Sequence, residues 1–96
     1  MQLHEALESV SDAASFLAFA RLLAEDRAAE VRKEAESSSS PYGPDANGWE
    51  NGTIEAFLEA AISWGEATEV GLSQGLKPDN PWKRFAVFLY CGKIYE

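Results

Sequence analysis

The apolar pattern of residues 12–36 constrains the fold more than any other feature of the chain. Ser11 and Asp12 supply a helix N-cap and a first-turn acid, and the apolar residues after them recur at α-helical spacing. The stripe expected to be buried consists of Ala13, Phe16, Leu17, Ala20, Leu23, Ala24, Ala28, Val31 and Ala35. Phe19 and Leu22 widen it in the first half, and the second half is more polar. We expect one long helix whose C-terminal end projects into solvent.

Two further segments before the C-terminal part have helical spacing. A short helix is expected over 3–10, and a longer one over 53–74, where Thr53 is the N-cap and Gly75 suits the left-handed residue that closes a helix. The buried face expected for the longer one contains Ile54, Phe57, Leu58, Ala61, Trp64, Thr68 and Leu72. Gly65 lies within this face, where the missing side chain would let another helix approach closely.

The C-terminal segment carries two conflicting signals. Asn80 and Pro81 form a typical helix start, which predicts a helix over 81–94. Residues 85–95 are also rich in aromatic and β-branched side chains, so a hairpin turning at Gly92 is the alternative. The spacing of the apolar residues from Trp82 favours the helix. Because apolar side chains surround it, such a helix is either central in the fold or faces a second subunit.

These elements predict an all-α fold. The expected architecture is a compact bundle of three to four helices, over 3–10, 12–36, 53–74 and 81–94, with a long loop over 37–52, where serine, proline and glycine gather. The 96 residues are expected to form a single domain, 1–96.

The net charge of -8 excludes some partners and favours others. It argues against nucleic acid and against an anionic membrane surface, and it is compatible with a basic protein. Solubility alone is the simpler explanation of the charge. No apolar run reaches the roughly 18 residues of a membrane helix, and a signal peptide is not recognisable, so we expect a cytoplasmic protein.

The acidic residues are unevenly placed. The chain has no lysine or arginine between Lys33 and Lys77, but it has eight acidic residues there. Four of them, with one apolar residue, fall in a stripe about 80° wide on the helix expected over 53–74: Glu55, Glu59, Ile62, Glu66 and Glu69. Such a stripe suits docking to a basic surface. The alternative is an ordinary solvated face whose charges are matched by Arg or Lys from elsewhere in the fold.

Two aromatic residues stand in the long loop. Tyr42 and Trp49 are candidates for contact with a partner, together with the acidic stripe. A tryptophan in such a loop is more often an anchor that holds the loop to the core than a binding platform.

Residues able to carry chemistry are few. We expect no enzyme activity, no metal and no cofactor. The only histidine is His4, whereas a di-iron bundle needs Glu-x-x-His from two helices. The apolar surroundings of Cys91 are expected to raise its pKa and leave it inert.

The second half of the chain resembles a known group of sequences. The string Trp49-Glu50-Asn51-x-Thr53 continues as x-x-x-Phe57-Leu58-Glu59, and the chain closes on Tyr95-Glu96. It resembles a family of small uncharacterised bacterial proteins. These are similar in size and charge to immunity proteins that neutralise secreted toxins, so the resemblance implies a stand-alone domain that is immunity-like.

Three functional hypotheses follow. The first is an acidic protein-interaction module that binds a basic partner. The second is a small-ligand binder or sensor with a pocket lined by Trp49, Trp64, Trp82 and Tyr90. The third is a structural homodimer built on the apolar last helix.

Overall fold

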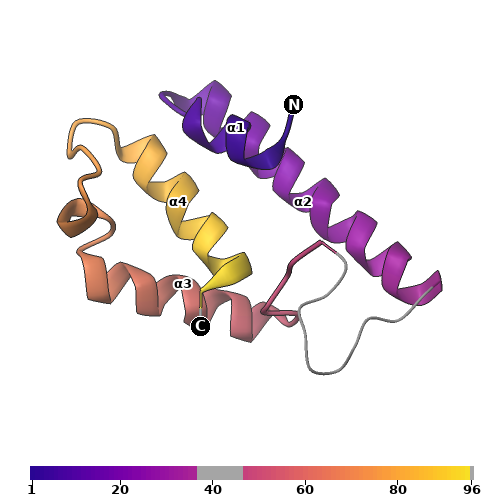
Figure 1. The fold of residues 1–96 in the computed structure, drawn as a ribbon. Coiled ribbons are helices and arrows are strands. Elements are labelled where there is room, and N and C mark those ends of the chain that lie inside the picture. Colours follow the sequence, from indigo (N-terminus) through magenta and orange to yellow (C-terminus); the bar gives the residue numbers. More distant parts are fainter. Residues whose placement is uncertain (37–46, 96) are drawn as a thin grey trace.

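The computed structural model describes residues 1–36 and 47–95. Their α-helices are α1 (Leu3–Glu8), α2 (Ala13–Glu36), α3 (Ile54–Thr68) and α4 (Pro81–Ile94), and a 3-10 turn, η1 (Leu72–Gln74), separates α3 from α4 (Figure 1). The fold is all-α, as expected. Residues 37–46 of the expected loop lie outside the described part of the chain.

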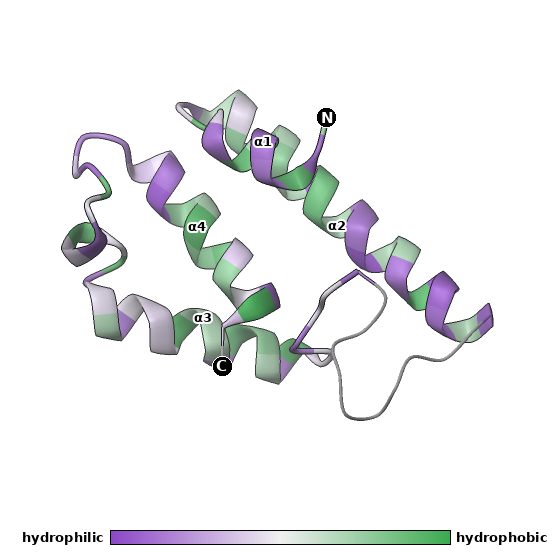
Figure 2. Cartoon of the chain, in the orientation of Figure 1, coloured by the Kyte–Doolittle hydropathy of each residue, from purple (hydrophilic) through white to green (hydrophobic). Residues whose placement is uncertain are grey.

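Helix α4 is the centre of the bundle. It contacts α1, α2 and α3, whereas α2 and α3 lie on opposite sides of it and share no helix–helix contact (Figure 1). Its residues are hydrophobic over most of its length beyond the first turn (Figure 2). The helix over 81–94 is confirmed, the hairpin alternative is wrong, and the apolar circumference belongs to a central helix.

The core lies where α1, the first half of α2 and α4 meet. Its buried residues are Ala6, Val10, Phe19, Leu23, Trp49 and Ala86. Leu3, Leu7, Phe16, Leu22, Phe57, Trp82, Leu89 and Tyr90 pack around them. Trp49 comes from the segment before α3, so the loop contributes a large apolar side chain to the core.

The buried face of α2 differs from the expected stripe. Phe19 and Leu23 are buried, but Leu17 is 64% exposed and Val31 is 53% exposed. The alanines of the stripe, except half-buried Ala20, are exposed as well. Both neighbours of α2 cover the side that carries the phenylalanine rings, because large side chains gain more from burial than alanines do. The expected stripe is therefore wrong for most of its members.

Polar side chains set the start of α2. The structure places the cap at Asp12, whose Oδ1 accepts a hydrogen bond of 2.9 Å from the Ser15 N–H. The Ser15 hydroxyl in turn accepts from the Asp12 N–H at 3.1 Å. The Ser15 backbone N–H and hydroxyl lower the pKa of the Asp12 carboxyl group. The helix before it ends at Glu8 rather than at residue 10, although Val10 is still buried.

Helix α3 ends earlier than expected. Thr53 caps its start as expected, since its Oγ1 accepts from the Ala56 N–H at 3.1 Å. Its end is Thr68 rather than residue 74, because Glu69 and Val70 both adopt the left-handed conformation, at φ 53° and 52°. Gly75 is left-handed as expected, but it closes η1 instead of the long helix.

Candidate functional site

The acidic stripe lies on the outer side of α3. Glu55, Glu59 and Glu66 are exposed, and Ile62 between them is 47% exposed. Glu69 is exposed too, but it follows the last helical residue. Within residues 1–36 and 47–95, none of these four carboxylates forms an ion pair. The alternative in which Arg or Lys from elsewhere in the fold matches these charges therefore finds no support in the described residues.

An exposed apolar ridge runs beside the acids. Two of its residues, Ile54 and Leu58, are predicted on the buried face, and that prediction is wrong for them, whereas Ile62 is predicted within the acidic stripe. Ile54 is 78% exposed and Leu58 is 46% exposed, and with Ile62 they follow one another at four-residue steps. The buried side of α3 is narrower and consists of Ala60, Ala61, Trp64, Gly65 and Thr68. Because α3 packs on α4 and not on α2, one side of it is covered and this ridge is not.

A hollow of about 370 Å³ adjoins the N-terminal end of the ridge. Its walls are Ile54, Phe57 and Leu58 of α3, Trp49 and the loop after it, and Arg27 of α2. The hollow brings apolar side chains of α3 next to a cationic side chain of α2, two elements that sequence spacing does not relate.

Trp49 is held at this place by polar contacts. Its Nε1–H donates to Asp26 Oδ2 at 2.8 Å, and the same oxygen accepts from Lys93 Nζ at 2.8 Å. The Trp49 ring stacks on Phe57 with centroids 6.0 Å apart, and the Arg27 guanidinium lies 5.5 Å from the Trp49 ring centroid. With 6% of its surface exposed, Trp49 is an anchor of the loop, as its position in the sequence suggested.

Glu30 holds the same segment from within α2. Its side chain is fully buried, and its Oε1 accepts from the N–H groups of Asn47 and Trp49 at 3.2 and 3.3 Å. Its other oxygen pairs with Arg27, which also donates to the Gly52 carbonyl at 2.9 Å. These contacts neutralise a buried charge that would otherwise be costly.

The next residues of the loop are tied to the end of α4. The Asn51 amide donates to the carbonyls of Gly92 and Tyr95 at 3.0 and 2.9 Å, and the Glu50 N–H donates to Lys93 O at 2.9 Å. Asp26, Arg27, Glu30, Asn47, Trp49, Asn51 and Lys93 form one set of contacts, which we call the loop clasp. Every buried side-chain polar atom among the described residues has a hydrogen-bond partner, so the loop clasp holds the loop without leaving a buried polar group unpaired.

The four aromatic residues of the ligand-pocket hypothesis do not line the hollow together: Trp49 is a core residue, and Trp82 and Tyr90 pack against the core. Trp49 belongs to the hollow beside α3, which none of the other three lines. Trp64 donates its Nε1–H to Gln74 Oε1 at 3.0 Å, and Trp82 packs between the rings of Phe16 and Phe85. Tyr42 lies outside the described residues.

The reactive side chains are far from activated. Cys91 is buried on the central helix, and desolvation raises the pKa of its thiol to about 11, in the direction expected from the sequence. His4 is exposed on α1. The described part of the chain gathers no three His, Cys, Asp or Glu side chains in an arrangement that could hold a metal ion.

The ridge was missed because its spacing fits a buried face equally well. Ile54 and Leu58 lie close to Phe57 and Ala61 around the helix, and only the absence of a second neighbour leaves them uncovered. An apolar stripe wider than one contact face is the signal that could have indicated this surface. No helix of the described residues has the length and apolar character required to traverse a lipid bilayer.

Neither the curated proteins nor the solved structures contain a match to the chain. A family model does match, over residues 12–96, and this range includes α2, α3, α4 and the loop clasp. The chain therefore belongs to the family of unknown function DUF7660.

Proposed function

We propose that the chain is a protein-interaction module that binds a basic partner on the outer side of α3. This surface consists of Ile54, Glu55, Leu58, Glu59, Ile62, Glu66 and Glu69, and we call it the α3 surface. The observation that supports the proposal is the exposed apolar ridge beside carboxylates that no described cation neutralises. Contiguous exposed apolar side chains rimmed by polar ones are typical of binding surfaces.

The two halves of the α3 surface have different roles in this proposal. Burial of the ridge supplies affinity, because covering one Ile or Leu side chain contributes about 1.5–3 kcal/mol. The carboxylates attract Lys and Arg of the partner, which raises the association rate and selects against acidic proteins. A partner with an apolar stripe flanked by basic residues matches both halves.

The hollow next to Trp49 extends this surface at its N-terminal end. A volume of about 370 Å³ is enough for one large apolar side chain, and the stacked rings of Trp49 and Phe57 form its apolar wall. The loop clasp fixes this wall, so the site is formed before the partner arrives. In this proposal, Trp49 contributes the wall of the hollow and not an exposed platform.

A small acidic domain that covers a basic partner is the arrangement expected of an immunity-like protein. We therefore propose that the chain is a bacterial protein that acts in the cytoplasm by binding rather than by catalysis. The buried Cys91 with its raised pKa and the fully bonded loop clasp are consistent with a role without chemistry.

The proposal is tested by capturing partners from a lysate of the source cells on the immobilised chain and identifying them by mass spectrometry. Glu59→Lys combined with Glu66→Lys should abolish capture, and Ile54→Ser combined with Leu58→Ser should weaken it at least about tenfold. The captured protein should be basic, and raised salt should release it.

The matched control is Glu8→Lys combined with Glu36→Lys. It makes the same change in net charge at exposed positions outside α3, near helix C-termini where lysine is favourable. Capture by the control should equal that of the unmodified chain. If the Glu59 and Glu66 variant still binds the partner, or if the control loses it equally, the α3 surface is not the binding site.

A further inference from the structure

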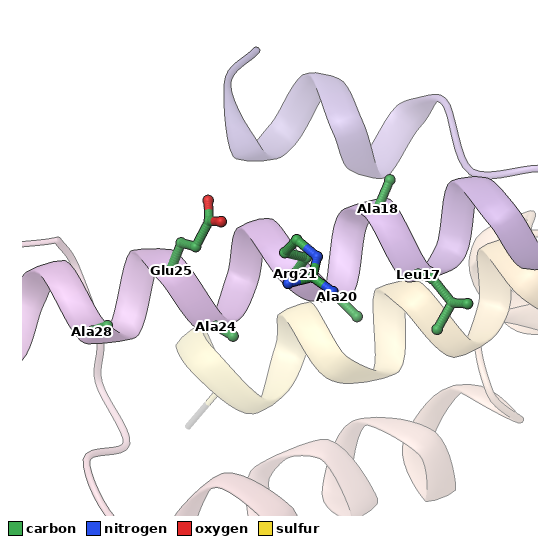
Figure 3. A pocket seen from close by; sticks show the side chains of 7 residues that line it. All are labelled: Leu17, Ala18, Ala20, Arg21, Ala24, Glu25 and Ala28. Carbon is green, nitrogen blue, oxygen red and sulfur yellow. The ribbon is translucent and has the colours of Figure 1, made fainter.

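A second apolar face remains uncovered, on α2. Leu17 and Val31 are exposed near its two ends, at 64% and 53%. Between them Ala20, Ala24 and Ala28 lie in a row along one side of the helix, on an open face that Arg21 and Glu25 also line (Figure 3). The apolar periodicity predicts these residues in the core, but α1 and α4 cover a different side of α2.

The spacing of the apolar residues on this face is the same when counted from either end. The face consists of Ala13, Leu17, Ala20, Ala24, Ala28, Val31 and Ala35, whose steps are four, three, four, four, three and four residues. The pattern is symmetric about Ala24. In an antiparallel pair of α2 helices centred there, Leu17 meets the second copy's Val31, Ala20 meets Ala28, and Ala24 meets itself. A two-fold symmetric interface requires this self-complementarity.

The charges beside the row are complementary under the same symmetry. Arg21 and Glu25 lie on one flank of the row (Figure 3), and neither forms an ion pair with another described residue. Arg21 precedes Ala24 by three residues, and Glu25 follows it by one. In the antiparallel pair, Arg21 therefore lies within two residues of the second copy's Glu25, or about 3 Å along the axis. The symmetry forms this pair twice.

We propose that this face of α2 binds a second copy of the chain in a two-fold symmetric antiparallel dimer. Alanines at the centre let the two helix backbones approach closely, and Leu17 and Val31 bury larger side chains toward the ends. One helix pair is smaller than a standard interface of about 800 Å² per partner, so the dimer forms at high protein concentration. The α3 surface lies on another helix, which makes this dimer independent of the function proposed above.

The first experiment measures mass by sedimentation equilibrium over a range of concentrations. The unmodified chain should dimerise, whereas Arg21→Glu and Glu25→Arg should each be monomeric, because like charges then meet across the two-fold axis. An equimolar mixture of the two variants should dimerise again, since each supplies the charge that the other lacks. Asp79→Lys, at an exposed position outside α2, should dimerise as the unmodified chain does.

Three results would overturn the proposal: an unmodified chain that stays monomeric at millimolar concentration, single variants that dimerise normally, or a mixture that stays monomeric. Circular dichroism checks that every variant is folded, which exposed helical positions should allow.

The second experiment tests the antiparallel register by disulfide formation in oxidising buffer. Ala24→Cys should crosslink with itself, because it lies on the two-fold axis. Ala20→Cys and Ala28→Cys should crosslink when mixed but not alone, and Ala67→Cys, at an exposed position on α3, should not crosslink. Self-crosslinking by Ala20→Cys, or crosslinking by Ala67→Cys as fast as by Ala24→Cys, would contradict this register.

Discussion

Glu30 shows how a single buried carboxylate can fix a loop. It lies on α2, beside Asp26 and Arg27 of the loop clasp, and it is fully buried. Its hydrogen bonds go to the backbone of Asn47 and Trp49, residues that are 17 and 19 positions away in the chain. Without those N–H groups and Arg27 the charge would have no partner, so the loop and the helix stabilise each other.

Replacement of Glu30 by alanine should therefore destabilise the protein strongly. The variant leaves two backbone N–H groups without their acceptor, at a cost of about 1–3 kcal/mol for each one that is buried, and Arg27 keeps only the Gly52 carbonyl. Urea unfolding followed by tryptophan fluorescence measures the loss. Glu36→Ala, at an exposed position on the same helix, should change the free energy of unfolding by less than about 0.5 kcal/mol. Equal stability of the two variants would contradict the role given to Glu30.

Sequence reasoning reached some of these residues and not others. The anchoring role of Trp49 was predictable, because a large aromatic side chain in a loop of small residues has few other uses. The burial of Glu30 was not, since a carboxylate on a helix is assumed to face water unless its partners are known. Those partners are backbone groups of a distant loop, and backbone groups leave no mark in the residue pattern.

The Cys91 thiol should make the free energy of unfolding decrease at alkaline pH. Burial raises its pKa to about 11 from the ordinary value of 9.0. Above pH 9 the unfolded chain loses the thiol proton and the folded chain keeps it, so stability falls as pH rises toward 11. Cys91→Ala should lack this component of the decline when denaturant unfolding is compared at pH 8 and pH 10. Identical pH dependence in both proteins would contradict it.

The end of α3 depends on contacts made after the helix has stopped. Arg84 of α4 donates to the carbonyls of Val70 and Glu69 at 3.0 and 3.3 Å, and Thr68 Oγ1 accepts from the Gly71 N–H at 2.9 Å. These bonds hold two non-glycine residues in the left-handed region, which is rare for a β-branched side chain. Glycine and proline mark where a turn is allowed, so the sequence predicts the end of the helix at Gly75. The helix ends earlier, at Thr68, where Arg84 of α4 binds the residues that follow it.

Substitution of two glycines should affect stability differently, because a neighbouring helix approaches one of them more closely than the other. A Cβ on Gly92 would lie 2.6 Å from the Phe57 ring, whereas a Cβ on Gly65 would have its nearest neighbour, on Phe88, at 3.7 Å. Gly92→Ala should therefore cost about 1–3 kcal/mol through overpacking, and Gly65→Ala should be neutral or stabilise by up to about 1 kcal/mol through helix propensity. Thermal unfolding of both variants checks the order. The reverse order would show that α3 and α4 can move apart at Gly92 without loss of stability.

The whole molecule is a central helix with α2 and α3 on opposite sides. This arrangement leaves each outer helix covered on one side, so each exposes an apolar face that resembles a core face in sequence. Periodicity predicts three to four helices, because it reports which residues share a face, and it leaves the last helix either central or facing a second subunit. It did not predict which faces are covered, since that depends on how many neighbours a helix has.

Because of the distribution of charge over the molecule, we expect Tm to rise with salt concentration. The net charge is -8, and the carboxylates of the α3 surface repel one another without an ion-pair partner among the described residues. Raising NaCl from about 0.01 M to about 1 M shortens the Debye length from about 30 Å to about 3 Å. This screens the repulsion, whereas the partly buried pair of Lys93 with Asp26 is screened much less.

Two variants distinguish the effect of net charge on this salt dependence from the effect of local repulsion. They are Glu59→Lys with Glu66→Lys, and the control Glu8→Lys with Glu36→Lys. Each changes two Glu to Lys, so each adds four to -8 and leaves a net charge of -4. The salt-induced rise in Tm should be smaller in both, and smallest for Glu59→Lys with Glu66→Lys, because that variant also replaces repulsion along α3 by attraction to Glu55. Equal responses in the two variants would mean that net charge alone sets the salt dependence. A Tm of the unmodified chain that falls with salt would mean that attraction between opposite charges outweighs repulsion among the acids.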